Sequence, residues 1–292
     1  MTETLRFDGR TAIITGAGRG VGRSEAVLLA RRGAGVVVND LPGHGAEEVV
    51  EEIVLAGGRA VAAPADVATR AGADALVAAA LENFGSLEIV INNAGIAGAA
   101  RFEDNPWEFF QRMWDVNAGS CVHVTQAAWP HLIASGSGRV IMTASSVGLW
   151  GRNVQTAYSM SKAAVHALAN SLSIEAREHG ITVNTLAPLA FTPMAASVIT
   201  DPEMQRRMAE RLDPDLVAPT VAWLVHESCT VTGEAFCVGA GKVTRAFMAE
   251  TEGYLDQAQT IESVAEHEAA IMDEDGYVVH SDGHGPVVWA VG

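Results

Sequence analysis

The chain has 292 residues, 49% of them hydrophobic and 18% charged, so it can bury a sizeable core and is not a disordered protein. A formal charge of −16 at neutral pH, with an isoelectric point near 4.9, argues against nucleic acid or an anionic membrane surface as a partner. We interpret the acidity as a solubility feature.

Short apolar segments rich in valine and isoleucine alternate with helical patterns from residue 11 onward. Their nearly continuous hydrophobicity is typical of strands covered on both faces. The predicted strands are Thr11–Thr15, Gly35–Asn39, Arg59–Ala63, Leu87–Ile91, Arg139–Thr143, Thr182–Leu186 and Ala235–Val238. The predicted helices cover residues 20–32, 45–56, 69–83, 106–134, 157–179 and 214–226. This alternation predicts an α/β fold, a single Rossmann-type doubly wound parallel sheet with helices on both faces.

The alternation stops near Arg245, so we divide the chain into a main domain at 1–244 and a C-terminal extension at 245–292. The extension contains a helix candidate at Ile261–Met272 and ends on Val287-Val288-Trp289. That apolar end favours packing on the domain or on a neighbouring subunit over a disordered tail. Within the main domain, residues 189–213 are expected to form a lid with a helix around Met204 and Met208.

A glycine-rich loop follows the first predicted strand and leads directly into a helix. It reads T-G-x-x-x-G-x-G over residues 15–22 and places Gly16, Arg19, Gly20, Val21 and Gly22 where a dinucleotide would bind. Glycines let the backbone turn tightly and approach a pyrophosphate at the positive end of a helix. A plain turn is the alternative, and the strand before and helix after make the nucleotide interpretation stronger.

Asp40 ends the second predicted strand, where an acidic side chain accepts hydrogen bonds from the hydroxyls of the adenosine ribose. Its carboxylate would repel a 2′-phosphate, so we predict NAD rather than NADP as the cofactor. Arg19 is the opposing signal, because a cation in the loop favours that phosphate. A strand-end turn is the alternative role for Asp40.

Tyr158 and Lys162 lie four residues apart at the start of a predicted helix, so their side chains share one face. A free phenol has a pKa near ~10, too high for proton transfer at neutral pH. A fixed ammonium nearby would lower that pKa and make Tyr158 a usable general acid and base.

Together these residues resemble the short-chain dehydrogenase/reductase family over residues 8–240. Besides the glycine loop, the family pattern is matched at Asp66-Val67, at Asn92-Asn93-Ala94-Gly95, and at Asn117, Ser145, Tyr158 and Lys162 in the family order and spacing. Within the family, Asn39-Asp40-Leu41, Ala128-Trp129, Trp223–Cys229 and Val238–Gly241 resemble the (3R)-hydroxyacyl-CoA dehydrogenase domain of peroxisomal multifunctional enzymes.

The resemblance implies a role for each matched residue. Tyr158 would exchange a proton with the substrate oxygen during hydride transfer at the nicotinamide, and Ser145 would stabilise the charge on that oxygen. Lys162 would also bind the nicotinamide ribose, and Asn117 would hold a water that links Lys162 to solvent. The remaining implied cofactor contacts are Asp66 and Val67 at the adenine, Asn93, Ala94 and Gly95 along the cleft, and Pro188 and Thr192 near the nicotinamide.

One segment departs from the family pattern. The family usually has P-G-x-x-x-T-x-M after the sixth strand, whereas this chain has a shorter segment without the glycine, Pro188-Leu189-Ala190-Phe191-Thr192-Pro193-Met194. Thr192 is therefore matched across a deletion. The chain also lacks the hydratase and sterol-carrier domains of the multifunctional enzymes.

An apolar substrate pocket is expected between Ala97–Phe102, Val147–Gln155 and Phe191–Leu212. Its predicted lining comprises Leu149, Trp150, Val154, Phe191, Met194 and Val198. This lining favours a secondary alcohol or ketone carrying either an acyl thioester or a bulky apolar group such as a steroid, terpenoid or aryl ring. Coenzyme A needs cations for its phosphates, and the candidates are Arg101, Arg152, Arg206, Arg207 and Arg211. A non-catalytic dinucleotide sensor and a scaffold without cofactor are the alternative functions.

Three cysteines form no C-x-x-C pair, and the polar N-terminus lacks the apolar stretch of a signal peptide, so a reduced cytoplasmic protein is expected. His280 and His284 have no further ligand at a recognisable spacing, so no metal site is expected. The expected partner is a further copy of the chain, in a homotetramer or a dimer, because the predicted helices at 106–134 and 157–179 are apolar on more than one face.

Overall fold

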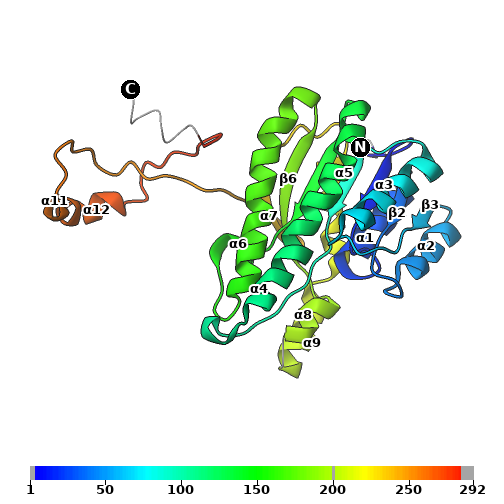
Figure 1. Ribbon diagram of the computed structural model, residues 1–292, viewed down its shortest axis with the longest axis horizontal. Coiled ribbons are helices and arrows are strands. Elements are labelled where there is room, and N and C mark those ends of the chain that lie inside the picture. The colour runs from blue at the N-terminus through cyan, green and yellow to red at the C-terminus, as the bar shows by residue number, and fades with distance from the viewer. Residues whose placement is uncertain (1–3, 199–200, 284–292) are drawn as a thin grey trace. The chain divides into compact units, whose positions relative to one another are not determined.

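The computed structural model describes residues 4–198 and 201–283, which group into two compact units divided after Arg245. The first unit is built on a sheet of strand order β3-β2-β1-β4-β5-β6-β7-β8 (Figure 1). The strands are β1 (Thr11–Ile14), β2 (Gly35–Val38), β3 (Arg59–Ala62), β4 (Ile89–Asn92), β5 (Arg139–Thr143), β6 (Thr182–Leu189), β7 (Ala235–Gly239) and β8 (Lys242–Ala246). Neighbouring strands from β3 to β7 are parallel, which confirms the predicted doubly wound fold.

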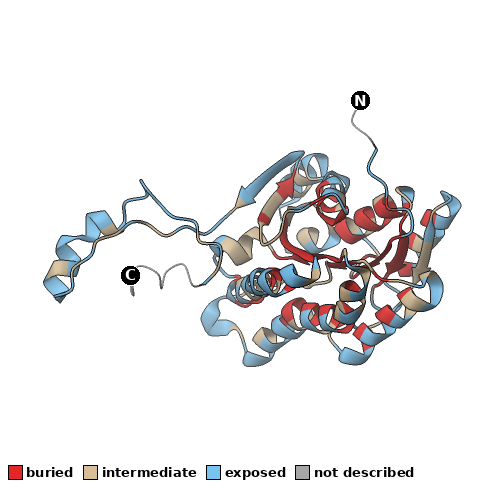
Figure 2. Cartoon of the chain, turned by 90° about the horizontal axis from the view of Figure 1, so that it is seen from above, coloured by how far each residue is buried: buried red, intermediate tan, exposed pale blue. Residues whose placement is uncertain are grey.

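Two apolar cores lie on the two faces of this sheet. The helices α1 (Gly20–Arg31), α2 (Ala46–Leu55) and α10 (Ala218–Val225) pack with one core, and α3 (Arg70–Phe84), α5 (Ser120–Ser135) and α7 (Thr156–Glu175) pack with the other. Successive strand residues point to opposite faces, so Ile13 belongs to one core and Ile14 to the other. Figure 2 shows buried residues along the strands and on the inner sides of the helices.

The predicted helix at 106–134 is interrupted in the structure. It consists of α4 (Trp107–Trp114), a π-helical turn at Asp115–Gly119, and α5. A π turn adds one residue to a helical turn and shifts the side chains that follow, and such turns recur at functional sites. Asn117, an expected site residue, lies inside this turn.

Several elements differ from the sequence prediction. The hairpin strand β8 follows β7 after Ala240 and Gly241, which both have positive φ, as a two-residue type I′ turn requires. The short helix α6 (Ser146–Trp150) was not predicted, and the lid segment contains α8 (Pro193–Val198) and α9 (Pro202–Arg211). Single 3-10 turns occupy Phe102–Asp104, Ala176–His179 and Pro214–Leu216. Among the described residues, no helix combines the length and apolar character needed to cross a bilayer.

The second unit contains two short helices, α11 (Ile261–Glu266) and α12 (Glu268–Ile271), in place of the single predicted helix at Ile261–Met272. The backbones of Glu250 and Val278 exchange hydrogen bonds of 2.9 and 2.8 Å, which joins the two ends of this unit. The apolar end Val287-Val288-Trp289 and His284 lie outside the described residues.

Candidate active site

The glycine loop between β1 and α1 has the conformation that a dinucleotide needs. Gly16 and Gly20 have φ of +62° and +59°, a region that side-chain-bearing residues rarely adopt. A Cβ on Gly16 would lie 2.8 Å from Cα of Ala94, so the β1 and β4 loops pack backbone to backbone. No side chain caps the N-terminus of α1, and its first turn carries no acid. Its amide groups therefore remain available for a pyrophosphate, and the loop fits a dinucleotide.

Asp40 lies beside this loop. Its Oδ2 accepts a hydrogen bond from the backbone N–H of Gly18 at 3.1 Å, and its Oδ1 accepts one from Leu41 at 2.9 Å. The side chain is only 14% exposed, so the carboxylate is held in place with little freedom to turn away. The structure thus brings the acidic residue and the glycine loop together, as the sequence predicted for a ribose contact.

Asn93 and Thr15 connect the two loops. The Asn93 amide donates to the backbone oxygens of Thr15 and Gly16 at 2.9 and 3.0 Å, and Thr15 Oγ1 accepts from the backbone N–H of Asn93 and Ala94. The side chain of Asn93 therefore positions the glycine loop. Thr15 has the same function and was not among the predicted site residues, because only its tertiary partners reveal it.

The two expected adenine contacts follow β3 and differ in exposure. Asp66 is exposed and accepts a hydrogen bond from the backbone of Ala68 at 3.0 Å, whereas Val67 is buried in the core. Of these two residues, Val67 thus has only its backbone available to a ligand.

Asn117 is fully buried and binds the segment that follows β4. Its Oδ1 accepts from the backbone N–H of Ile96 at 2.8 Å, and its Nδ2 donates to the backbone oxygen of Ile96 at 3.0 Å and to Ser161 Oγ at 2.9 Å. Ser161 Oγ in turn donates to the backbone oxygen of Tyr158. Ser161 is therefore a positioning residue that the prediction missed, and its only signal is a small polar side chain one helical turn after Tyr158.

Ser145 is the N-cap of α6, where its Oγ accepts a hydrogen bond from the backbone N–H of Val147 at 3.2 Å, and Tyr158 lies in the first turn of α7. Burial raises the pKa of the Tyr158 phenol, and the Ser145 side chain offsets part of that rise. Gly148 lets the two helices approach, because a Cβ there would lie 2.6 Å from the backbone of Lys162.

Lys162 lies on α7 one turn after Tyr158 and is 3% exposed. Its Nζ donates a hydrogen bond to the backbone oxygen of Thr143 at 2.7 Å, and burial lowers the pKa of the ammonium. A Cβ on Gly95 would lie 2.8 Å from Asn117 Oδ1 and 3.2 Å from Lys162 Nζ, so Gly95 lies between the two. The Tyr158 pKa in this structure is raised, in contrast to the lowering expected from Lys162, because burial is the largest cause.

The lid segment begins beside the glycine loop. A Cβ on Gly20 would lie 3.1 Å from the Thr192 side chain, and the backbone N–H of Phe191 donates to Leu212 at 2.7 Å, which closes the segment at its base. Pro188 lies within β6, and Met194 is on α8. The side chain of Val198 lies outside the described residues.

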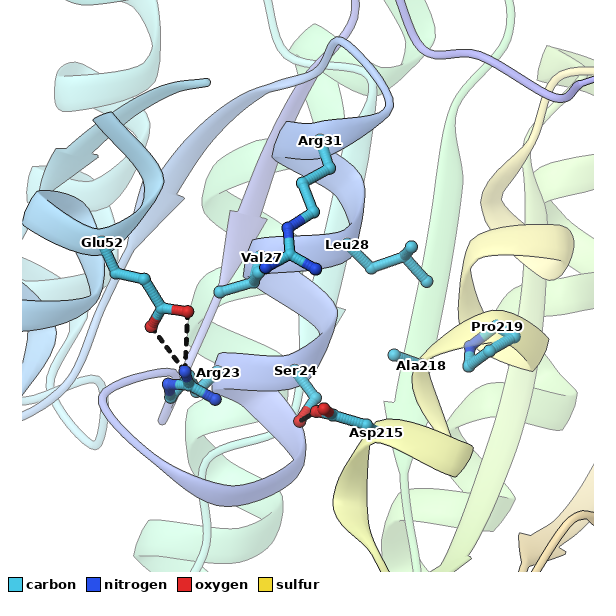
Figure 3. A pocket seen from close by; sticks show the side chains of 9 residues that line it. All are labelled: Arg23, Ser24, Val27, Leu28, Arg31, Glu52, Asp215, Ala218 and Pro219. Carbon is cyan, nitrogen blue, oxygen red and sulfur yellow. Dashed lines mark hydrogen bonds and ion pairs between the residues drawn. The ribbon is translucent and has the colours of Figure 1, made fainter. Parts of the chain in front are cut away.

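Two cavities in the first unit are lined by described residues that bear on the site or its surroundings. One, of about 200 Å³, lies where the segment after β4 meets the loop before α7, and it includes Val154 of the predicted pocket. Another, of about 180 Å³, lies between α1, α2 and α10 (Figure 3). In that cavity Arg23 is paired with Glu52, Ser24 donates a hydrogen bond to Asp215, and Arg31 is a further lining residue.

The fold is a doubly wound sheet with a glycine loop at its first helix, a serine just after β5, and a tyrosine and a lysine in the first two turns of α7. This combination defines a dinucleotide-dependent oxidoreductase acting on CH–OH groups. The chain belongs to the short chain dehydrogenase family, whose model matches residues 10–203. The cofactor is accordingly a nicotinamide dinucleotide, NAD or NADP.

Three similar proteins bear on the function. Peroxisomal multifunctional enzyme type 2 of Mus musculus is 39% identical over 94% of this chain, which spans 38% of that protein, and this confirms the predicted resemblance. A putative short-chain type dehydrogenase/reductase of Mycobacterium tuberculosis is 38% identical over 91% of this chain and 95% of its own. The structure of a 7α-hydroxysteroid dehydrogenase, complexed with NADH and 7-oxo glycochenodeoxycholic acid, is 34% identical with a TM-score of 0.75, covering 82% of this chain and 98% of its own.

Proposed function

We propose that this protein interconverts a secondary alcohol and a ketone with NAD, with a 3-hydroxyacyl thioester as the substrate and Tyr158 as the acid and base. The observation that carries the proposal is the placement of Tyr158 and Lys162 one turn apart on α7, with Ser145 near enough to lower the Tyr158 pKa and with Lys162 and Asn117 beside Gly95. Shared similarity to the multifunctional enzymes supports the thioester, although the chain spans less than half of the mouse protein.

The chemistry follows from these side chains. When bound, the nicotinamide accepts the hydride of the alcohol or returns it to the ketone. The Tyr158 phenolate removes the hydroxyl proton in oxidation, and the phenol returns it in reduction. The Ser145 hydroxyl holds the substrate oxygen and stabilises the charge that develops there. Lys162 is held close to Gly95 by Thr143, on the side where the resemblance places the nicotinamide ribose.

NAD is the proposed cofactor because Asp40 is fixed beside the glycine loop. A buried carboxylate repels a 2′-phosphate, and two backbone hydrogen bonds keep it from turning away. Arg19, at the start of α1, makes no capping bond with its side chain and remains the residue that would favour NADP.

A bulky apolar secondary alcohol is the second candidate, and the similarity to a 7α-hydroxysteroid dehydrogenase supports it. Trp150 is 69% exposed at the end of α6, next to the expected pocket, and would cover a large apolar ring. A hydroxysteroid, a terpenol and an aryl carbinol represent this class.

A substrate panel tests the proposed function. Reduction of NAD and of NADP is followed by absorbance with 3-hydroxyacyl thioesters, hydroxysteroids, terpenols and aryl carbinols. Turnover of the thioesters with NAD supports the first candidate, and turnover of the free alcohols alone supports the second. A protein that binds NADH but leaves every alcohol of the panel unoxidised, and the corresponding carbonyls unreduced, would be a dinucleotide sensor, and one that binds neither cofactor would be a scaffold.

Self-association belongs to this proposal. Large apolar side chains are exposed on α4, α5 and α7, namely Trp107, Trp114, Val122, Met160 and Ile174. Exposed apolar side chains of this size on these helices favour a homotetramer or a dimer. We also propose that residues 245–292 form an extension that packs on the domain or on a neighbouring subunit. Light scattering that gives a monomer at micromolar concentration would refute the self-association.

The compartment is proposed from the cysteines. Cys121, Cys229 and Cys237 are free thiols, which fits a reducing environment such as the cytoplasm. Peroxisomal relatives make the peroxisome the competing location, and fractionation of the source cells distinguishes the two.

A further inference from the structure

Two arginines converge on the cavity beside the catalytic helix. Arg101 and Arg152 line the cavity of about 200 Å³, with Phe102, Glu103, Asn153, Val154 and Thr156. Thr156 is the first residue of α7 and precedes Tyr158 by two positions, and the loop that carries Arg152 joins the helix that Ser145 begins to the helix that carries Tyr158. The cavity therefore lies at the N-terminal end of α7, the helix that carries Tyr158.

The backbone around both arginines is fixed. A hydrogen bond of 2.8 Å from the backbone N–H of Ala100 to the backbone oxygen of Val154 joins the two segments. The backbone oxygen of each arginine also accepts a hydrogen bond that closes a turn, from the backbone N–H of Asp104 to Arg101 and from that of Gln155 to Arg152. Val154 has a φ of +56°, a strained conformation for a β-branched residue. Strain of this kind is kept only where the surrounding contacts impose it.

The charges of this pair are poorly matched. Arg101 lies 3.7 Å from Glu103, and both side chains are more than half exposed, so the pair contributes little. Within the described part of the chain, Arg152 has no carboxylate at ion-pair distance. Other arginine–carboxylate pairs are tight, at 2.5 to 2.8 Å, and involve Arg6, Arg23, Arg70, Arg206 and Arg245. In a chain with 35 acidic and 19 basic residues, neither arginine of this pair has a tight carboxylate partner among the described residues.

We propose that Arg101 and Arg152 bind the anionic, non-reacting end of the substrate, a phosphate or a carboxylate. Guanidinium groups bind both anions through paired charge-assisted hydrogen bonds, which a weak contact with Glu103 would not prevent. The inference rests on the proposed function. It also selects these two arginines from the five candidates in the sequence, because Arg206, Arg207 and Arg211 do not line this cavity and Arg206 is bonded to Glu203 at 2.6 Å.

Matched pairs of substrates test this subsite and distinguish the two sources of the anion. One pair is a 3-hydroxyacyl-CoA and the same acyl group on neutral N-acetylcysteamine. The other is a hydroxysteroid carboxylate and its methyl ester. Arg101→Ala and Arg152→Ala should each raise KM roughly tenfold for the anionic substrate of one pair, because each variant loses about one charge-assisted hydrogen bond. KM for the neutral substrate of the same pair should change by less than about twofold.

Two further variants make the result specific. Glu103→Gln removes the competing carboxylate and should lower KM for the same anionic substrate, which a merely damaged fold would not do. Arg177→Ala is the control, since it removes an exposed arginine beyond the far end of the same helix, about 30 Å away by helix length, and should leave KM unchanged. If KM changes equally for both substrates of each pair, or does not change for any substrate, the subsite proposal is wrong. Turnover of the neutral alcohols would still support the proposed function in that case. If no alcohol in either pair is oxidised, both proposals are wrong.

Discussion

Glu25 should make the protein less stable as the pH rises. This residue lies on α1, is 1% exposed, and neither carboxyl oxygen has a hydrogen-bond partner among the described residues. Burial alone raises the pKa of its carboxyl to about 8, from an ordinary value of 4.5. Between those two values the folded state holds a proton that the unfolded state has lost, so the free energy of unfolding falls as pH increases.

The size of the effect follows from the shift. From pH 5 to pH 8.5 the penalty of ionising Glu25 grows by about 4 kcal/mol, at ~1.4 kcal/mol for each pH unit between the two pKa values. Glu25→Gln keeps the shape of the side chain but does not titrate, so the variant should lack this part of the pH dependence. Urea unfolding of both proteins at each pH, at one protein concentration, measures the difference.

Glu48→Gln, on the exposed side of α2, is the matched control because it removes the same charge from the surface. Its stability should follow that of the wild type across the pH range. If the Glu25→Gln and wild-type free energies also remain parallel from pH 5 to 8.5, Glu25 does not titrate in this way and the reasoning is refuted.

Three further predictions concern the site. Tyr158→Phe should lower kcat by about 10³-fold through loss of acid–base catalysis, with NAD affinity retained in a fluorescence titration; an active variant would contradict the proton-transfer role. Asp40→Ala should raise kcat/KM with NADP roughly tenfold, because the carboxylate that repels the 2′-phosphate is gone, and unchanged discrimination would assign the preference to Arg19. Ser161→Ala leaves Asn117 without one partner and should cost about 1–2 kcal/mol of stability. The kcat of the Ser161→Ala variant should fall while its affinity for NAD is unchanged. An equal loss of kcat and of NAD affinity would indicate a structural role only.

The predicted strands β1, β2, β4 and β5 are buried throughout, and burial on both faces produces an unbroken apolar segment. Such a signal is local, so β1, β2 and β5 begin where the prediction placed them. The edge strand β8 consists of exposed, mostly polar residues and has no comparable signal. The helix α6 is a single short turn that depends on the cap at Ser145, and the π turn at Asn117 depends on tertiary contacts with Ile96.

Electrostatics at the site were less accessible from sequence. The spacing of Tyr158 and Lys162 correctly places both on one face of α7, but it does not reveal that the Thr143 carbonyl binds the ammonium. Nor does it reveal how deeply the phenol is buried, and burial decides the direction of its pKa shift. Local spacing therefore predicts that Tyr158 and Lys162 share a helix face, whereas their protonation depends on neighbours distant in sequence.

The topology explains why so much of the site was predictable. In a parallel sheet the carboxyl ends of all strands meet at one edge, and ligands bind where the strand order reverses, here between β1 and β4. Residues that follow successive strands must therefore lie close together, namely Gly16, Asp40, Asp66, Asn93 and Ser145. The arginine pair has no such constraint, because Arg101 and Arg152 lie in connections whose lengths the sheet does not fix. The positions of the proposed reacting groups thus follow from the sheet, whereas the proposed binding of the substrate's anionic end depends on the loops. The paired substrates therefore test the part of the function that the fold leaves open.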